Sequence, residues 1–550
     1  MRSATVALVV ARLLFLGTAA FVLWRNSQVA VLVDISWIVN NATRIALGDI
    51  PYRDFPLAQT PGEFVVQALL IKLFGAQYEV QIFYASLCGG AATLLAYLIA
   101  RRVLSGAVPS SDWLAAILAL PLIPLGIYAI LPNPFYDSDA CLAVLGGIAL
   151  LFAARDKPTA FRFAIAGAVA TVPLAFKQNI GGPFLVAVIA VLALEAWAEP
   201  ARRRELRWFS LGVAAAIVVG IVLLQLFVGI DAYLRGTVGF AMSGRGIDLE
   251  RIHEFADPGV LLTTALVVAL AVGGPRLAER TRAILAVSAI LLLVVSLVPT
   301  VLGGPQLLFP PFLMAAAALC LVRATRDGPT LEGLLPLVLL GTTLGTLESQ
   351  GLNGSTYGIV PLLALAIACV VRDLAHVVPR PRRLAPYAGV IVAFVLTWSG
   401  TTFTTENIRL RFIDANAPGP VARSTFPALA GLSARGRYVP DLDAILFWVR
   451  DHVPPGESLV FLPGEDPAYY ALGRRPALPT VFFYFGDVAT PYTPEQIVSI
   501  ADDVGLRWVV VKDKLQETLA PPRASEVVSG LTRRATLVAT VGSYRVFRRD

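Results

Sequence analysis

The chain has few charged residues, few cysteines and few histidines for its length, and each shortage excludes a class of protein. Only 15% of its 550 residues are charged and 56% are hydrophobic, whereas soluble domains hold about 25% and about 45–50%. Water is therefore not the main solvent of this chain. Its four cysteines and three histidines are too scattered for a disulfide framework or a zinc motif. The sequence also has no Walker loop, dinucleotide-binding glycine fingerprint or Ser-His-Asp signature.

Long apolar runs are the dominant feature of the sequence. Runs of roughly 17–25 residues, enough for a helix to cross a bilayer, begin at about thirteen points. They start near Ala4, Val80, Asp112, Asp139, Phe161, Ile180, Trp208, Pro258, Ala283, Pro305, Leu331, Tyr357 and Leu384. The sequence therefore predicts a polytopic α-helical membrane protein with about thirteen transmembrane helices.

Arginine clusters predict how the chain is oriented. Clusters such as Arg101–Arg102, Arg202–Arg204 and Arg380–Arg383 fall in every second connection between apolar runs, and an excess of Lys and Arg marks cytoplasmic loops. This pattern explains the net charge of +7 without nucleic acid as a partner. We therefore expect a multi-pass protein of a bacterial inner membrane, with loop 25–79 and the C-terminal segment on the periplasmic side.

Two parts of the chain are predicted to be structured outside the bilayer. The membrane module spans residues 1–403, and its first periplasmic loop, 25–79, has apolar residues at helical spacing in two segments, around Ile35–Ile45 and Phe64–Ile71. We expect two amphipathic helices along the membrane surface. Residues 404–550 mix short apolar runs with turn residues and predict a soluble α/β domain. Its strands are expected at 458–462, 480–485, 507–512 and 536–541, with a helix at 494–504.

Three carboxylates at the periplasmic boundary are candidates for chemistry. Asp34 precedes the first surface helix, which is expected to begin at Ile35, and Asp137 and Asp139 precede a predicted span. Each could cap a helix, which aspartate does well. Ionisable groups held at the edge of a membrane bundle are costly and are treated as functional hypotheses. Capping and catalysis are compatible roles.

Two cations on the same side could bind a phosphate. Lys177 lies between two predicted spans, where it could extend its ammonium to the membrane interface or neutralise a phosphate as a point charge. Arg245 lies in the loop 242–257, where charged side chains are usually only solvated.

The first loop carries the most specific pattern in the sequence. Asp34 and the helix after it are followed by segments 48–56 (GDIPYRDFP), 59–62 (QTPG) and 73–75 (LFG). With the long helical bundle and the soluble tail, this arrangement resembles the GT-C superfamily of polyprenyl-phosphate-sugar-dependent membrane glycosyltransferases. It is most similar to bacterial members related to protein mannosyltransferases and lipid A aminoarabinose transferases.

The resemblance implies a hexosyl or pentosyl transferase. Such an enzyme moves a sugar from a polyprenyl-phosphate donor to a glycan, lipid or protein acceptor of the cell envelope, at the periplasmic face of the bilayer. It implies that Asp34 is the catalytic base and that Asp139 or Asp137 is a second catalytic acid. The residues it implies for binding substrate or phosphate are Lys177, Arg245, Tyr52, Arg53 and Asp54. Metal use is left open, since Asp34 and Asp139 could coordinate Mg²⁺ or Mn²⁺ or act without a cation.

Two other classes of function fit a polytopic membrane protein. A transporter would place polar residues and broken helices near the middle of the bilayer and would show paired repeats, whereas here the polar candidates gather at one interface. A non-catalytic scaffold would use the α/β domain to bind a partner and the acids only as helix caps.

Overall fold

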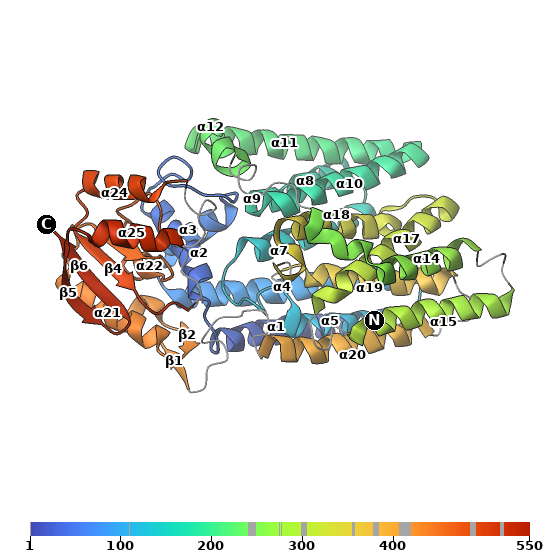
Figure 1. Ribbon diagram of the computed structural model, residues 1–550. Helices are drawn as coiled ribbons and strands as arrows, with labels where there is room; N and C mark the ends of the chain where they lie inside the picture. Colours follow the sequence, from blue (N-terminus) through green and yellow to red (C-terminus); the bar gives the residue numbers. More distant parts are fainter. Residues whose placement is uncertain are drawn as a thin grey trace.

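The computed structural model describes residues 2–108, 111–239, 249–273, 276, 278–298, 305–354, 358–377, 384–405, 420–483, 491–516 and 522–550. A long bundle of helices carries, at one end, a small domain built on a β-sheet (Figure 1). This confirms the predicted fold class, a polytopic helical protein with a C-terminal α/β domain.

Eight helices of the described residues are long and apolar enough to cross a membrane. They are, with the bounds of the whole helix, α1 (Arg2–Asn26), α4 (Tyr78–Leu104), α7 (Tyr136–Asp156), α10 (Gln178–Ala198), α11 (Arg203–Phe227, after η1, Pro200–Arg202), α17 (Phe309–Asp327), α18 (Leu331–Gly354) and α20 (Leu384–Thr405). The protein is therefore a multi-pass membrane protein. The number of thirteen spans stays a prediction.

Shorter helices complete the bundle. They are α5 (Ser111–Ala119), α6 (Leu122–Leu125), α8 (Ala160–Ala170), α9 (Val172–Phe176), α12 (Ile230–Leu234), η2 (Arg235–Gly239), η3 (Leu249–Ala256), α14 (Pro258–Gly273), α15 (Glu279–Val295), η5 (Pro305–Leu308) and α19 (Val360–Val377). Helix α19 lies inside the bundle, with nearly every side chain from Val360 to Ala375 buried. Residues Val360–Val371 are apolar on all sides of the helix, which suits a helix that has no face toward water.

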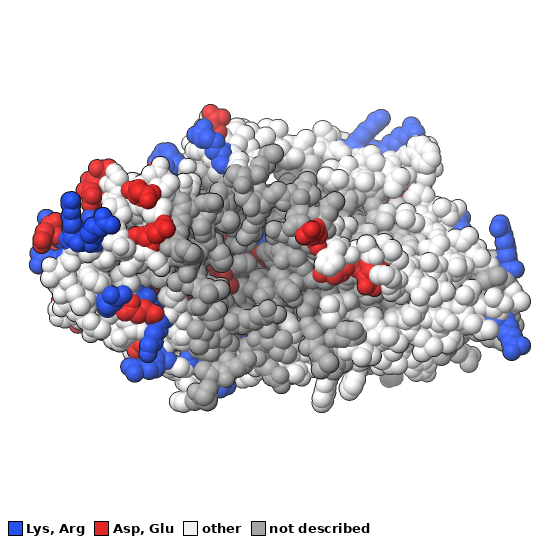
Figure 2. Space-filling model, in the orientation of Figure 1, with Lys and Arg blue, Asp and Glu red and all other residues white. Residues whose placement is uncertain are grey.

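Ion pairs join the helix ends that lie far from the sheet domain. Arg102 at the end of α4 pairs with Asp156 of α7 (2.7 Å) and Glu332 of α18 (2.8 Å). Arg155 of α7, whose side chain is 7% exposed, pairs with Glu195 and Glu205. On the face shown in Figure 2, Lys and Arg lie mainly over the sheet domain and the opposite end of the molecule. Arg102 and Arg202, from two of the predicted clusters, thus lie with Arg155 at one end of the bundle.

The C-terminal domain is built on a four-stranded mixed sheet of order β3-β4-β6-β5. Its strands are β3 (Leu459–Leu462), β4 (Trp508–Lys512), β5 (Ala535–Val541) and β6 (Tyr544–Arg549), of which β3 and β4 are parallel and the other pairs antiparallel. Val460 and Val509 face a core with α24 (Pro494–Asp503) and α25 (Pro522–Thr532), and Phe461 and Val510 face the side of α21 (Tyr438–His452). Both faces of β3 and β4 are therefore covered, which suits their continuous apolar sequence.

Most predicted elements of this domain are confirmed. Three of the four expected strands and the helix at 494–504 are present, but residues 480–483 form no strand, and 484–485 lie outside the described residues. The reason is that Phe482 packs against the ring of Trp37, with ring centroids 5.5 Å apart, instead of joining the sheet. Smaller elements before β3 and β4 are β1 (Val421–Arg423), η8 (Pro427–Leu429), β2 (Ser433–Arg435) and α22 (Ala468–Leu472).

The first loop contains the two expected helices, α2 (Leu32–Ala46) and α3 (Gly62–Phe74). Helix α2 does not lie on a surface, because eleven of its fifteen residues are buried. It packs against α3 and against α22 of the sheet domain. The first loop is therefore the layer between the bundle and the C-terminal domain (Figure 1).

Candidate active site

The candidate residues lie where the first loop meets the bundle. Gly62, the first residue of α3, has no room for a side chain, because a Cβ there would come 2.4 Å from the carbonyl oxygen of Ala175. The side chain of Gln59 donates to the hydroxyl of Tyr136 (3.4 Å) and that of Gln178 to the carbonyl of Ala58 (3.4 Å). The loop is thus fitted onto the start of α7 and the junction of α9 with α10.

Lys177 and Asp137 form a buried ion pair at this point. Their side chains are 6% and 3% exposed, and the ring of Tyr136 lies 5.0 Å from the Lys177 ammonium. Lys177 can reach inward because its backbone is extended (φ −155°, ψ 115°) and breaks the helix between α9 and α10. The alternative in which Lys177 extends to the membrane interface is wrong, since a buried ammonium is tolerated only where an opposite charge pairs with it.

Asp139 belongs to a second buried network. Its carboxylate accepts hydrogen bonds from the hydroxyls of Tyr128 (2.6 Å) and Tyr84. Glu63 hydrogen-bonds to Asp139, and Gln67 donates to Glu63 (2.8 Å). Burial, and then the negative charge of Asp139, raise the pKa of Glu63 well above its usual value. No sequence pattern singles out Glu63, since an acid in the first turn of a helix is ordinary.

None of the three aspartates caps a helix. Helix α2 begins at Leu32, three residues before the expected start, so Asp34 lies inside its first turn and is half-buried. Asp137 and Asp139 lie in the first turn of α7, whose N-cap is Phe135 without a side-chain bond. The interpretation of these acids as N-caps is therefore wrong.

A residue from the far end of the chain takes the place of a cap on α2. The side chain of Gln516 accepts a hydrogen bond from the backbone N–H of Leu32 (2.9 Å) and donates to the carbonyl of Ala30 (2.8 Å). Its own backbone N–H donates to Glu465 (2.6 Å). The sheet domain thus holds the turn of helix on which Asp34 lies.

A buried cluster of charges supports that contact. The Lys512 ammonium lies 2.8 Å from both Glu465 and Asp466, and Tyr544 donates to Asp466 (2.9 Å). Burial alone would lower the pKa of Lys512, but the charges of Asp466 and Glu465 outweigh it and raise that pKa. Asn40 of α2 donates to the backbone carbonyl of Asp466 (3.0 Å), so the cluster is joined directly to the first loop.

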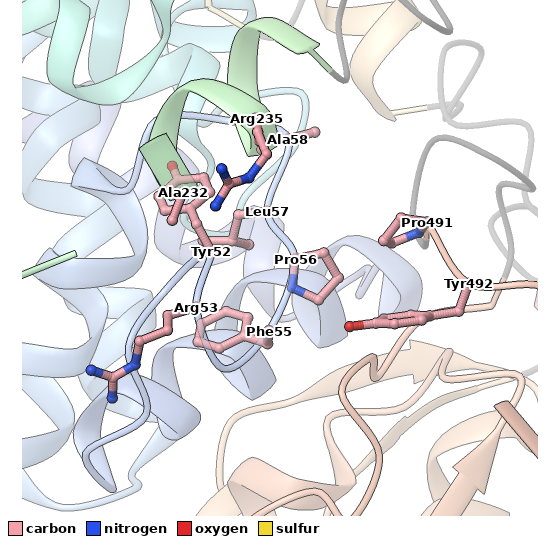
Figure 3. Close-up of a pocket in the computed structure, with 11 residues that line it drawn as sticks. Tyr52, Arg53, Phe55, Pro56, Leu57, Ala58, Ala232, Arg235, Pro491 and Tyr492 are labelled. Atoms are coloured by element: carbon pink, nitrogen blue, oxygen red, sulfur yellow. The ribbon is translucent and has the colours of Figure 1, made fainter. Parts of the chain in front are cut away.

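The predicted loop residues 52–54 divide into two groups. Tyr52 and Arg53 line a cavity of about 220 Å³ between the first loop, α12–η2 and residues 491–492 (Figure 3). Asp54 instead stabilises its own turn: it accepts from the N–H of Ile50 (2.7 Å) and pairs with Arg53 (3.0 Å), and the bond from Arg53 lowers the pKa of Asp54. Arg245 lies outside the described residues.

Two tyrosines at this site have strained backbones. Tyr52 and Tyr128 both have a φ of 65°, and within the described ranges they are the non-glycine residues with positive φ. Such conformations cost about 1–3 kcal/mol and gather at functional sites. Tyr52 lines the cavity and Tyr128 binds Asp139. The strain therefore favours a functional role for this region of the molecule.

The structure is similar to solved membrane glycosyltransferases. It matches the apo oligosaccharyltransferase of Archaeoglobus fulgidus with a TM-score of 0.51 at 13% identity, over 92% of this chain and 69% of that one. The chain has the GT-C fold. ArnT of Cupriavidus metallidurans also matches at 13% identity over 99% of this chain, with TM-scores of 0.43 bound to undecaprenyl phosphate (97% of that chain) and 0.45 in the apo state (98%). No model of a protein family and no curated protein sequence matches the chain.

The described part of this GT-C fold contains no group of three or more His, Cys, Asp and Glu residues suited to a metal ion. Both carboxylate oxygens of Asp139 accept hydrogen bonds from tyrosine hydroxyls. A hard cation prefers several free carboxylate or carbonyl oxygens. Coordination of Mg²⁺ or Mn²⁺ by Asp34 and Asp139 stays a prediction, and no step below involves a metal.

Proposed function

We propose that the protein transfers a sugar from a polyprenyl-phosphate donor to an acceptor of the cell envelope. The observation that carries this proposal is the buried Lys177–Asp137 pair, at the end of a GT-C-fold bundle where the first loop and the sheet domain converge. The archaeal protein of the same fold is named for the transfer of an oligosaccharide. We further propose a membrane module of residues 1–403 and a C-terminal domain of residues 404–550, the latter periplasmic.

The reaction is a displacement at the anomeric carbon of the donor sugar. The acceptor hydroxyl forms a bond to this carbon while the bond to the phosphate oxygen breaks, and the bonding electrons leave with the phosphate. A carboxylate within hydrogen-bond reach takes the proton of the hydroxyl. We assign this base to Asp34, which is only partly buried and whose helix turn is held by the two side-chain hydrogen bonds of Gln516.

The leaving phosphate gains negative charge in the transition state. A fixed ammonium in surroundings with little water stabilises that charge more than a solvated one would. We assign this role to Lys177, for which the departing phosphate competes with Asp137. Arg245 is a further candidate cation. Asp139 positions Tyr84 and Tyr128 through its hydrogen bonds, and the turn at Arg53 and Asp54 fixes the loop.

Mass spectrometry of envelope glycans and lipid-linked sugars tests the proposal. A strain without the gene is compared with the same strain carrying the wild-type gene or Asp34→Asn. The expected result is one missing sugar and accumulation of its polyprenyl-phosphate donor, both reversed by the wild type alone. Identical profiles in all three strains, with the protein present in the membrane, would contradict transfer and direct attention to transport.

A further inference from the structure

The cavity beside Tyr52 is formed by three distant parts of the chain. Its walls are first-loop residues 52–53 and 55–58, Ala232 of α12 with Arg235 and Gly236 of η2, and Pro491 and Tyr492 of the sheet domain. Figure 3 shows the Arg235 side chain extending from η2 toward Tyr52, and the Tyr492 hydroxyl pointing toward Phe55 and Pro56. Each of the three structural layers thus contributes one wall.

The backbone and the ring of Tyr52 are held in place by neighbouring residues. The positive φ of Tyr52 (65°) is fixed by the hydrogen bond from its N–H to the carbonyl of Phe55 (2.8 Å). Its ring crosses that of Tyr233 edge-on, with centroids 5.4 Å apart. A Cβ on Gly236 would come 2.4 Å from the Tyr52 ring, so only glycine leaves room for it. The packing around Tyr52 therefore determines the shape of this side of the cavity.

The cavity is lined by aromatic rings and by the guanidinium group of Arg235. Tyr52, Phe55 and Tyr492 offer aromatic surfaces and Pro56 and Pro491 apolar ones, and such flat apolar faces suit the C–H faces of a sugar ring. Within the described ranges no carboxylate pairs with Arg235, whereas Arg53 pairs with Asp54. Arginine binds carboxylate and phosphate groups through two parallel N–H donors. At about 220 Å³ the cavity is smaller than the roughly 300–1,000 Å³ of sites for larger ligands.

Hydrogen bonds connect this cavity to the Lys177–Asp137 pair. The Tyr52 hydroxyl donates to the carbonyl of Gln59, and the side chain of Gln59 donates to the hydroxyl of Tyr136, which precedes Asp137 in the chain. The cavity lies on the side of the sheet domain, away from the apolar interior of the bundle (Figure 3). This side suits a polar acceptor better than the lipid part of a donor.

We propose that the cavity binds one sugar unit of the acceptor, and that this sugar carries a carboxylate or phosphate group bound by Arg235. The proposal rests on the proposed transferase function, because it names the class of acceptor that the same site takes. It also defines Arg235 as a residue that determines specificity, without contact with the reacting atoms.

Direct binding to the purified full-length protein in nanodiscs tests the proposal. Saturation-transfer NMR is recorded with glucuronate, glucose 6-phosphate and glucose, in the absence of donor. We expect at least one of the two acidic sugars to bind better than glucose, and which one binds identifies the charged group. Arg235→Gln should weaken that binding by about tenfold or more, the effect of losing a charge-assisted hydrogen bond.

Two further variants separate charge from shape. Arg423→Gln removes an exposed arginine on β1, away from the cavity, and should leave binding unchanged. Ala232→Trp fills the cavity and should abolish binding of every sugar, even where the fold is intact. The proposal is overturned if no acidic sugar binds the wild type, if glucose binds equally well, or if Arg235→Gln binds acidic sugars like the wild type.

The binding assay is independent of turnover, so the two proposals can fail separately. If Arg235-dependent binding is found but the deletion strain has an unchanged glycan profile, the transferase proposal fails and the sugar site stands. If a sugar is missing in the deletion strain but Arg235→Gln binds and transfers normally, the transferase stands and the assignment of this cavity fails.

Discussion

The ammonium of Lys177 is paired with the carboxylate of Asp137, and neither side chain is more than 6% exposed. The opposite charges compensate each other at this depth, since a single buried ion loses its hydration without compensation. The pair therefore keeps a cation available inside the protein, at the break between α9 and α10. An arriving phosphate would meet an ammonium that is already dehydrated.

Replacing Lys177 should separate stability from activity. Lys177→Met removes the ammonium that is paired with the buried carboxylate of Asp137, and should lower the free energy of unfolding by about 3–5 kcal/mol. The double variant Lys177→Met/Asp137→Asn should regain much of that loss but should still not transfer sugar. Thermal unfolding in detergent and glycan analysis measure the two effects, with Lys72→Met on the exposed side of α3 as control. Normal transfer by the double variant would exclude Lys177 from phosphate binding.

Asp34→Asn should abolish transfer and leave the protein folded in the membrane. Loss of a general base typically slows the chemical step by about 10²–10⁴-fold. Asp34→Glu should retain a measurable fraction of the activity, because the carboxylate remains on the same helix turn. Asp231→Asn, on an exposed position of α12, is the matched control. If Asp34→Asn and the control restore the missing sugar equally, Asp34 is not the base.

Patterns local in the sequence predicted most of the fold. The helical spacing of Ile35, Ile38 and Val39 predicted α2, and the apolar run 507–512 predicted β4, because burial on known faces leaves a periodic signal. The segment 480–483 was misjudged because Phe482 packs on Trp37 and does not join the sheet. A short apolar run does not show which part of the protein it will pack against.

Contacts between distant residues account for what the sequence could not predict. Lys177 and Asp137 were separate candidates, and only the fold shows that they form a pair across 40 positions. The hydrogen bond between Glu63 and Asp139 is likewise visible only in the folded structure. Gln516 is 484 positions from Leu32, so no local rule connects it with the first turn of α2. Arg235 belongs to no sequence motif, and it became a candidate binding residue only because the structure places it at the cavity.

Gln516→Leu should loosen the turn of helix that carries Asp34. The variant loses both side-chain bonds to Ala30 and Leu32 and leaves two buried backbone groups unsatisfied. We expect the free energy of unfolding to fall by about 1–3 kcal/mol, with faster hydrogen exchange in residues 32–36. Gln28→Leu, which loses only a bond to the neighbouring Ser27, should have little effect on either measurement. Equal exchange in both variants would show that the sheet domain does not hold this turn.

The carboxyl group of Glu63 should make stability depend on pH. Burial and the neighbouring Asp139 raise its pKa in the folded protein above the usual 4.5. The folded state therefore binds this proton more tightly than the unfolded chain, so stability is greatest at low pH and falls as the pH rises from the unfolded value through the folded one. Glu63→Gln keeps an acceptor for Gln67 and removes the titration.

We expect Glu63→Gln to have a flatter dependence of Tm on pH than the wild type, from about pH 5 to about pH 8, and a higher Tm at the upper end. Scanning fluorimetry in detergent at several pH values measures both curves. Glu79→Gln, at an exposed position of α4, is the control and should follow the wild type. Parallel curves for the wild type and Glu63→Gln would mean that Glu63 is ionised in the folded protein.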